Sequence, residues 1–176
     1  MPSILDRPYF RDEAAAYAKV ESIVWPNGPV CVHCGETNRI GLLKGNATRP
    51  GIYKCYRCRK QVRVTVGTIF EASHIALHHW LQAIYLMVSS KKGVSSNQLH
   101  RTMGITLKSA WFMSHRIREA TGASMAKVEL PASRGSDAFD QVVKKITDSV
   151  RAQRNQAKKD RSTRLQDAPA QRPAKE

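Results

Sequence analysis

The sequence predicts an α+β fold in which helices surround one small, cysteine-rich β module. Residues 30–66 have the pattern of short strands and turns, and they hold all four cysteines of the 176-residue chain. Hydrophobic residues recur at helical spacing before this stretch and again from residue 74 onward. A β module this short has little apolar core of its own, so we expect another interaction to stabilise it.

The first helix is expected to begin after Asp12 and to end near Val24. The Asp12 carboxylate can accept a hydrogen bond from the first helical turn, as N-cap residues do. The turn residues at 25–28, which include Pro26 and Gly28, then stop the helix. Its apolar positions at helical spacing are Ala14, Tyr17, Val20 and Val24. This helix makes up the first predicted domain, residues 1–28.

Residues 29–70 form the second predicted domain, with strands expected at 39–43, 51–55 and 62–66. Its cysteines follow the pattern C-x2-C-x20-C-x2-C, which is typical of structural zinc sites. Two C-x2-C turns on neighbouring hairpins can place four thiolates around one ion. The expected zinc ligands are Cys31, Cys34, Cys55 and Cys58.

Four sulfur ligands fill the coordination sphere of zinc, so we expect one structural ion rather than a catalytic one. Redox dithiols, an iron–sulfur centre and unliganded cysteines are the alternatives. His33 lies inside the first cysteine pair, and we expect it to face solvent rather than to replace a cysteine. We interpret His74, His78 and His79 as residues on helix faces rather than as a second metal site.

The charge distribution indicates a polyanionic partner. The formal net charge is +15, and residues 37–118 contain 14 Lys or Arg against one acidic residue, Glu71. An almost unopposed positive field of this kind attracts nucleic acid above all. The alternative is a basic surface that only keeps the protein in solution.

Residues 71–122 are expected to form a three-helix bundle, with helices at 77–90, 96–103 and 107–121. Ser95 or Ser96 can cap the second helix and Thr106 the third. Gly104 marks a tight turn between them, and two helices joined in this way are typical of a helix-turn-helix.

The third helix is the expected DNA-recognition helix. Leu107, Ala110 or Trp111, Ser114 and Ile117 are expected to face the bundle. The candidate DNA contacts on this helix are Lys108, Ser109, Phe112, His115 and Arg116. Further candidates are Arg101, Lys91 and Lys92 in the bundle, and Arg57, Arg59 and Lys60 on the β module. A bundle with an ordinary solvated basic face is the alternative.

Residues 123–176 form the last predicted segment: a linker, an amphipathic helix and a disordered basic tail. Ser136 can cap a helix over residues 137–152, whose apolar stripe requires a partner. Residues 154–176 are polar and lack aromatic side chains, so we expect them to be disordered.

Several strings of this sequence resemble the N-terminal region of insertion-sequence transposases of the zinc-ribbon family, a DDE-type family. They are TRPGIYKCYRCRK, VGTIFEASHI, SSKKGVSSNQLHRTMGIT and KSAWFMSHRIRE, and the resemblance covers about residues 5–121. The first pair reads CVHC where the family usually has proline after its first cysteine, which leaves the ligands unaffected. The resemblance implies DNA transposition, with duplex DNA, including transposon terminal repeats, and the full-length transposase as partners.

Members of the family continue into a catalytic domain of ribonuclease H type, in which three acidic residues hold two divalent ions. Only 54 residues follow Gly122 here, so we expect a truncated chain that lacks this domain and does not cut DNA. Such a chain would bind element ends or regulate transposition, with oligomerisation left open. The alternatives are one part of a split transposase, whose tail carboxylates such as Asp137 or Asp140 contribute to catalysis, and a protein-interaction module.

The N-terminal sequence has no signal-peptide pattern, and no run of residues is apolar enough for a membrane span. We therefore expect a cytoplasmic protein. The resemblance adds a bacterial, nucleoid-associated setting.

Overall fold

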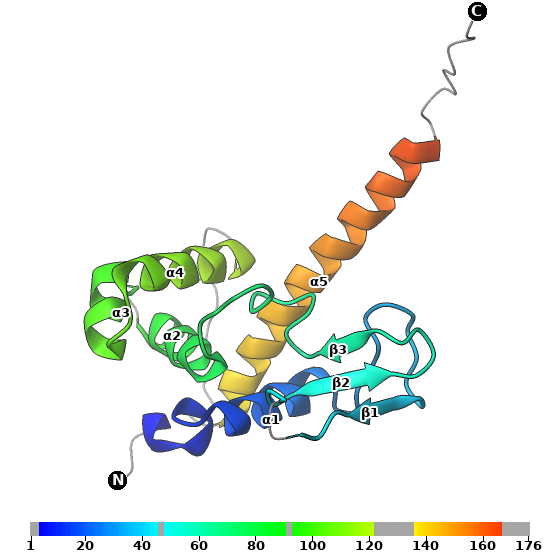
Figure 1. Ribbon diagram of the computed structural model, residues 1–176. Coiled ribbons are helices and arrows are strands. Elements are labelled where there is room, and N and C mark those ends of the chain that lie inside the picture. Colours follow the sequence, from blue (N-terminus) through cyan, green and yellow to red (C-terminus); the bar gives the residue numbers. More distant parts are fainter. Residues whose placement is uncertain (1–3, 46–47, 91–92, 122–135, 167–176) are drawn as a thin grey trace, which may run out of the picture.

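The computed structural model describes residues 4–45, 48–90, 93–121 and 136–166 (Figure 1). The chain combines helices with one small antiparallel sheet at one side of the molecule, which confirms the predicted α+β fold class (Figure 1). The helical elements are η1 (Ile4–Asp6), η2 (Pro8–Phe10), α1 (Glu13–Val24), α2 (Leu77–Ser89), α3 (Ser96–Met103), α4 (Leu107–Thr121) and α5 (Ser136–Gln166). The strands are β1 (Ile40–Leu42), β2 (Ile52–Cys55) and β3 (Gln61–Arg63).

Helix α1 begins as predicted, because the Asp12 side chain accepts a hydrogen bond of 2.8 Å from the backbone N–H of Ala15. Its buried face differs from the prediction. The buried residues are Ala16, Val20 and Ile23, whereas Ala14 is exposed. The helix contacts η2, α2 and α5. These three neighbours determine which face of the helix is buried, and helical periodicity alone predicted a different face.

The three strands pair in the order β1-β2-β3, with Ile40 opposite Cys55 and Ile52 opposite Arg63. The third strand was predicted over residues 62–66 but ends at Arg63. There the backbone N–H of Val66 donates to the Arg63 carbonyl at 3.2 Å, which closes a turn instead of continuing the ladder. Val64 is nevertheless fully buried. The alternation of apolar residues over 62–66 therefore reflects which side chains are buried, not how far the strand extends.

Helices α2, α3 and α4 form the predicted bundle. The Ser95 hydroxyl caps α3 by accepting from the backbone N–H of Gln98, and the Thr106 hydroxyl accepts from the N–H of Ser109 at the start of α4. Gly104 ends α3 with a positive φ of 66°, a left-handed conformation that glycine adopts without steric cost. Helix α2 contacts both α3 and α4, and its residues Trp80, Leu81 and Ile84 are fully buried.

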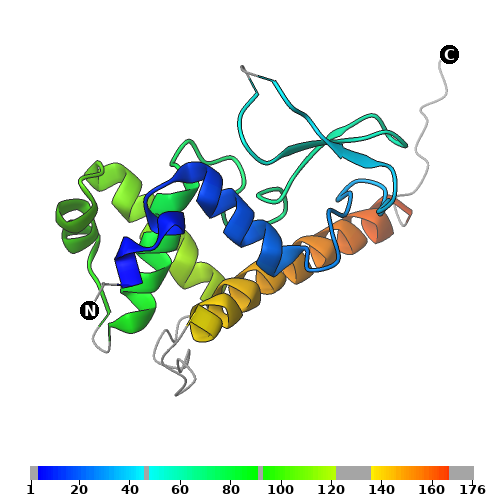
Figure 2. The same cartoon turned by 90° about the horizontal axis from the view of Figure 1, so that it is seen from below.

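Helix α5 is longer than predicted and finds its partner within the chain. The ring of Phe139 lies 5.5 Å from that of Phe10 and 6.2 Å from that of Tyr85. In Figure 2 the helix runs beside α1 and continues along the loop that carries the first cysteine pair. The helix extends to Gln166, so the predicted disorder is wrong for residues 154–166, whose composition favours helix. The predicted disorder of residues 167–176 lies outside the described residues.

Within the described ranges, no helix combines the length and the hydrophobicity that crossing a membrane requires.

Candidate metal centre and nucleic-acid interface

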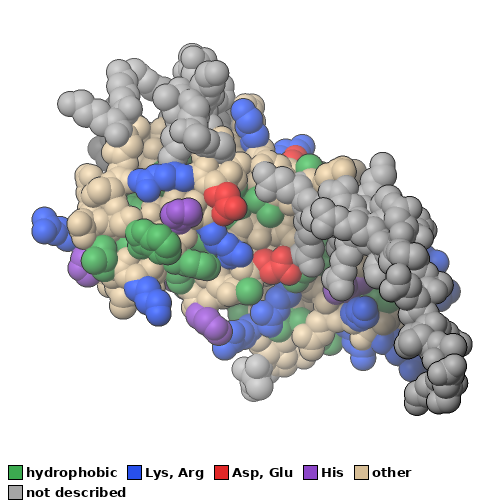
Figure 3. Space-filling view, turned by 90° about the horizontal axis from the view of Figure 1, so that it is seen from above, with side chains coloured by type: hydrophobic (Ala, Val, Ile, Leu, Met, Phe, Trp, Pro, Cys, Tyr) green, Lys and Arg blue, Asp and Glu red, His purple; other side chains and the backbone are tan. Residues whose placement is uncertain are grey.

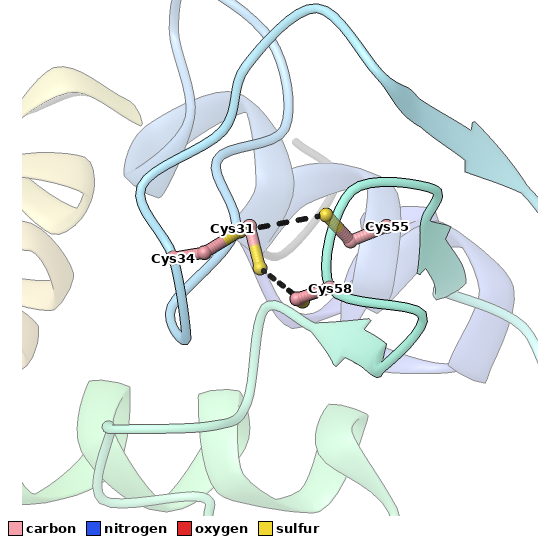
Figure 4. Close-up of side chains that lie close together, drawn as sticks. All are labelled: Cys31, Cys34, Cys55 and Cys58. Atoms are coloured by element: carbon pink, nitrogen blue, oxygen red, sulfur yellow. Dashed lines mark hydrogen bonds between the residues drawn. The ribbon is translucent and has the colours of Figure 1, made fainter.

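Two tight turns carry the four cysteines (Figure 4). In the first turn, which precedes β1, the N–H of Gly35 donates to the Cys31 carbonyl at 2.9 Å. In the second, between β2 and β3, the N–H of Cys55 donates to the Lys60 carbonyl at 3.0 Å. Both turns use a residue with positive φ, Gly35 at 74° and Arg59 at 59°. This backbone geometry directs the thiols of both turns toward one point.

The sulfur atoms have the spacing of a tetrahedral metal site. The Sγ atoms of Cys31 and Cys58 lie 3.6 Å apart, as do those of Cys34 and Cys55, and all four lie within 4.8 Å of one another. A disulfide would need about 2.05 Å, whereas zinc bonds of about 2.3 Å place tetrahedral sulfurs about 3.8 Å apart. The observed separations fit zinc, so the arrangement is that of one structural zinc site.

Local hydrogen bonds and crowding set the pKa values of the thiols. Backbone N–H groups, first of Cys58 and then of Arg57, hold the pKa of the Cys55 thiol down to about 7. At Cys34 the N–H of Glu36 also lowers the pKa, but burial and the neighbouring thiols together raise it to about 12. Thiolates this close repel one another, and a divalent cation among them removes that repulsion.

The site is closed, which fits a structural role. Cys31 and Cys55 are buried, and four sulfurs leave no position on zinc for water or substrate. His33 is exposed, in agreement with the expectation that it faces solvent. Among the residues with described placement, the four cysteines are the one group of three or more His, Cys, Asp or Glu side chains that could share an ion.

The two cysteine turns and strands β1–β3 together form one unit, which we call the ribbon. It is attached to α1 through Tyr53 of β2. Its hydroxyl donates to Glu21 Oε2 at 2.8 Å, and its ring meets the edge of Trp25 at a centroid distance of 5.6 Å. Burial raises the pKa of Glu21, although the hydrogen bond from Tyr53 works in the opposite direction. The metal site and the helical part are therefore joined by direct side-chain contacts.

The exposed side of α4 combines apolar, basic and aromatic side chains. Trp111 is 58% exposed and its ring lies 5.0 Å from that of His115, while Lys108 is exposed. Figure 3 shows hydrophobic side chains bordered by Lys, Arg and His on the side of the molecule where α3 and α4 lie. We call this surface the α4 face; it consists of Leu107, Lys108, Trp111, Phe112 and His115.

The orientation of α4 differs in part from the prediction. Leu107 was expected to face the bundle but is 48% exposed, and of the two alternatives Ala110 and Trp111 it is Ala110 that is buried. Met113 is fully buried and was missed. The buried residues of α4 are Ala110, Met113, Ser114, Ile117 and Ala120. They follow helical spacing, so the sequence contains the signal for this buried face.

Arg116 was predicted to contact DNA, but its guanidinium is engaged within the protein. Its Nη1 donates to the carbonyls of Ile69 and Glu71 at 2.9 and 2.7 Å, and the group lies over the Phe112 ring at 5.1 Å. These bonds fix the turn that follows the ribbon against α4. These contacts give Arg116 a structural role, while its contact with DNA stays a prediction.

The remaining candidate residues are distributed over the surface. Arg101 is exposed on α3, Arg59 and Lys60 are exposed on the second cysteine turn, and Ser109 is half-buried with its hydroxyl bonded to Thr106. Arg57 lies 3.5 Å from the carboxylate of Glu36. Lys91 and Lys92 lie outside the described residues. Helix α4 thus brings together its own candidates, while those of the ribbon form a separate group.

Known proteins match this chain in two comparisons. Residues 11–61 match the family described as "Transposase zinc-ribbon domain". Over 122 residues the chain is 27% identical to a protein of Halobacterium salinarum named "Uncharacterized protein in transposable element ISH50". That match covers 69% of this chain and 40% of the relative. No solved structure matches the chain.

Proposed function

We propose that this protein, whose residues 11–61 form a transposase zinc-ribbon domain, binds duplex DNA through the α4 face. The observation that carries the proposal is the exposed side of α4, which begins at Leu107 shortly after α3 ends at Met103. An aromatic and apolar surface that stays uncovered on a basic helix is typical of a binding surface. The net charge of +15 supports an anionic partner.

In this arrangement the first two turns of α4 enter the major groove. Recognition helices turn their N-terminal side chains toward the base edges, and Lys108 lies in the first turn of α4. Leu107 and Trp111 supply apolar surface for thymine methyl groups and sugars. The backbone phosphates are contacted by Arg101 of α3 and by Arg57, Arg59 and Lys60 of the ribbon.

Zinc contributes stability rather than chemistry. The four cysteines Cys31, Cys34, Cys55 and Cys58 hold it, and the ion links the turn before β1 to the turn between β2 and β3. The ribbon in turn packs on α1 through Tyr53, and Arg116 ties the following turn to α4. Zinc therefore keeps the basic turn of the ribbon in place, and Arg116 joins the segment that follows the ribbon to α4.

We propose the terminal repeats of a transposable element as the DNA partner. The transposase zinc ribbon and the relative from a transposable element support this choice. A chain that occupies such ends would also compete with a complete transposase and so regulate transposition. The match reaches only 40% of the relative, so the activity of that longer protein is not transferred to this chain.

Fluorescence anisotropy with the zinc-loaded chain and a labelled duplex tests DNA binding. We expect Lys108→Ala and Trp111→Ala each to weaken binding about tenfold, which corresponds to the loss of one good contact. Lys145→Ala, an exposed position on α5, is the control for the loss of one charge. Binding that does not respond to salt, or that all three variants affect equally, would contradict the proposal.

The second candidate function is strand transfer together with a separate catalytic subunit. Asp140, one of the carboxylates considered for this role, already has a contact within the protein. Asp140 forms an ion pair of 2.5 Å with Lys19, in a half-buried position between α5 and α1. A two-metal centre needs several carboxylates together, and the part of the chain that the structure describes gathers no group of three. A strand-transfer assay with Mg²⁺ that loses activity on Asp140→Asn, with DNA binding intact, would favour this second candidate.

A further inference from the structure

A cleft of about 640 Å³ lies where the ribbon meets the helical part. The ribbon contributes Arg49 and Arg63, α1 contributes Tyr17, and the segment before α2 contributes Ser73 and His74. The cleft therefore collects hydrogen-bond donors from three separate parts of the chain. The sequence marks Arg49 and Arg63 as basic residues that could bind phosphates, but it does not predict that they share a cleft.

The charge in the cleft is positive. Among the ion pairs of the described residues, none involves Arg49 or Arg63, and Glu13 is the one carboxylate that lines the cleft. Two guanidinium groups and one carboxylate give the cleft a formal net charge of +1. Arginine pairs bind phosphate well, because each planar guanidinium presents several N–H donors in a fixed geometry.

Tyr17 and Ser73 are held in place at this cleft. The Tyr17 ring lies against the backbone of Gly51, so closely that a Cβ at residue 51 would be 2.4 Å from it. Burial raises the pKa of Tyr17, and the charges of Arg63 and Arg49 act against that rise, which agrees with their proximity. The Ser73 oxygen accepts from the Trp80 indole N–H and from the Ile75 backbone N–H, both at 3.1 Å, so its own O–H remains a donor.

We propose that this cleft binds a phosphate group, held by the guanidinium groups of Arg49 and Arg63 with the hydroxyl of Ser73 and the ring of His74 as further donors. The first turn of α2 lies on the same wall, and its lack of acidic residues is compatible with an anion there. The phosphate belongs either to the backbone of a bound nucleic acid or to free phosphate, and the chemistry is the same for both. The site does not depend on the proposed role of α4.

The test uses the full zinc-loaded chain and the double variant Arg49→Gln/Arg63→Gln. Lys144→Gln/Lys145→Gln, which removes two exposed charges on α5, is the matched control. One arm titrates inorganic phosphate and follows the arginine Nε–H signals by NMR, against chloride at equal ionic strength. The other arm measures the affinity for a duplex by anisotropy at several salt concentrations. Thermal unfolding confirms that both variants remain folded.

If the phosphate comes from a nucleic acid, the cleft variant binds the duplex about tenfold more weakly, and the slope of log K against log salt falls by about 0.9. If it is free phosphate, saturable shifts of the Arg49 and Arg63 signals appear, and duplex binding matches that of the control. The proposal is overturned when neither arm separates the cleft variant from the control. Because the phosphate arm needs no DNA, it stands even if the α4 face fails to bind a duplex.

Discussion

Gly51 shows how one missing side chain permits a contact between distant segments. Its φ of +71° disfavours L residues, and the Tyr17 ring occupies the space where a Cβ would lie. The ribbon can approach α1 this closely only because residue 51 is glycine.

Gly51→Ala is expected to destabilise the fold by about 2–4 kcal/mol, since it combines backbone strain with overpacking. Gly104→Ala is the matched control: its φ is +66°, but no atom lies within 4 Å of the added Cβ. This control should cost only the strain, about 1–2 kcal/mol. Chemical denaturation of both variants measures the difference, and equal losses would show that the contact with Tyr17 contributes nothing.

Glu21 makes stability depend on pH. Because burial raises its pKa above the ordinary 4.5, the folded state binds the proton more tightly than the unfolded state. The contribution of this group is fully present below pH 4.5 and is lost as the pH rises through the raised value. Glu21→Gln keeps an acceptor for the Tyr53 hydroxyl and carries no charge.

We therefore expect Glu21→Gln to raise the melting temperature at neutral pH, with a gain that shrinks as the pH falls toward 4.5. Thermal unfolding followed by circular dichroism over a pH series measures it. Glu119→Gln, at an exposed position, is the control. A gain that stays constant with pH would assign the effect to something other than the Glu21 carboxylate.

Among the elements, the ribbon depends most on a bound ion. Its strands contain only three or four residues each, too few to form an independent core. The zinc site joins the two turns and so replaces the missing apolar burial.

Cys55→Ser is expected to abolish stoichiometric zinc binding and to unfold the ribbon, since Cys55 is fully buried at the site. A chelator should reproduce this effect on the unaltered chain. Elemental analysis together with amide hydrogen exchange of residues 31–63 gives the readout. Exposed His33, replaced by Ala, is the control and should retain zinc. Full zinc content in Cys55→Ser would refute the four-sulfur site.

The junction between ribbon and bundle relies on Arg116. Arg116→Met keeps an apolar stem over Phe112 but removes both bonds to the carbonyls of Ile69 and Glu71. We expect a loss of about 2 kcal/mol in unfolding free energy with the zinc content unchanged. Arg101→Met, on the exposed side of α3, is the comparison. Weaker DNA binding in Arg116→Met without any loss of stability would instead favour the predicted DNA contact.

The sequence predicted where helices begin and end, because these signals are local. It did not predict which faces of the helices pack against distant elements. Asp12, Ser95, Thr106 and Gly104 act at helix ends through their own neighbours, and each has the predicted effect. The cysteine spacing likewise encodes the metal site. The buried faces of α1 and α4 depend on which helices pack against them, and helical periodicity alone does not contain that information.

For the whole molecule, α5 is the element that completes the core. Its residues Phe139, Val142, Val143 and Ile146 are buried against the helices that precede it. The sequence predicted this apolar stripe and that another surface would cover it. That surface is formed by helices of the same chain, including α1 and α4.

Phe139→Ala is expected to destabilise the entire chain by about 3–5 kcal/mol, because it removes an aromatic ring that contacts Phe10 and Tyr85. Lys145→Ala on the exposed side of α5 is the control. Denaturant unfolding monitored by tryptophan fluorescence should show the loss in one cooperative transition. If only α5 detaches while the bundle keeps its stability, the helix is an accessory rather than a part of the core.

The contact between α5 and the N-terminal segment has a consequence for synthesis. Lys19 and Asp140 are 121 positions apart, so their ion pair cannot form until the ribosome has released most of the chain. The parts of Phe10 and α1 that α5 covers in the folded protein stay exposed during that time, whereas the two cysteine turns of the ribbon can already bind their ion. Translation thus separates two maturation events, early metal capture and late closure of the core.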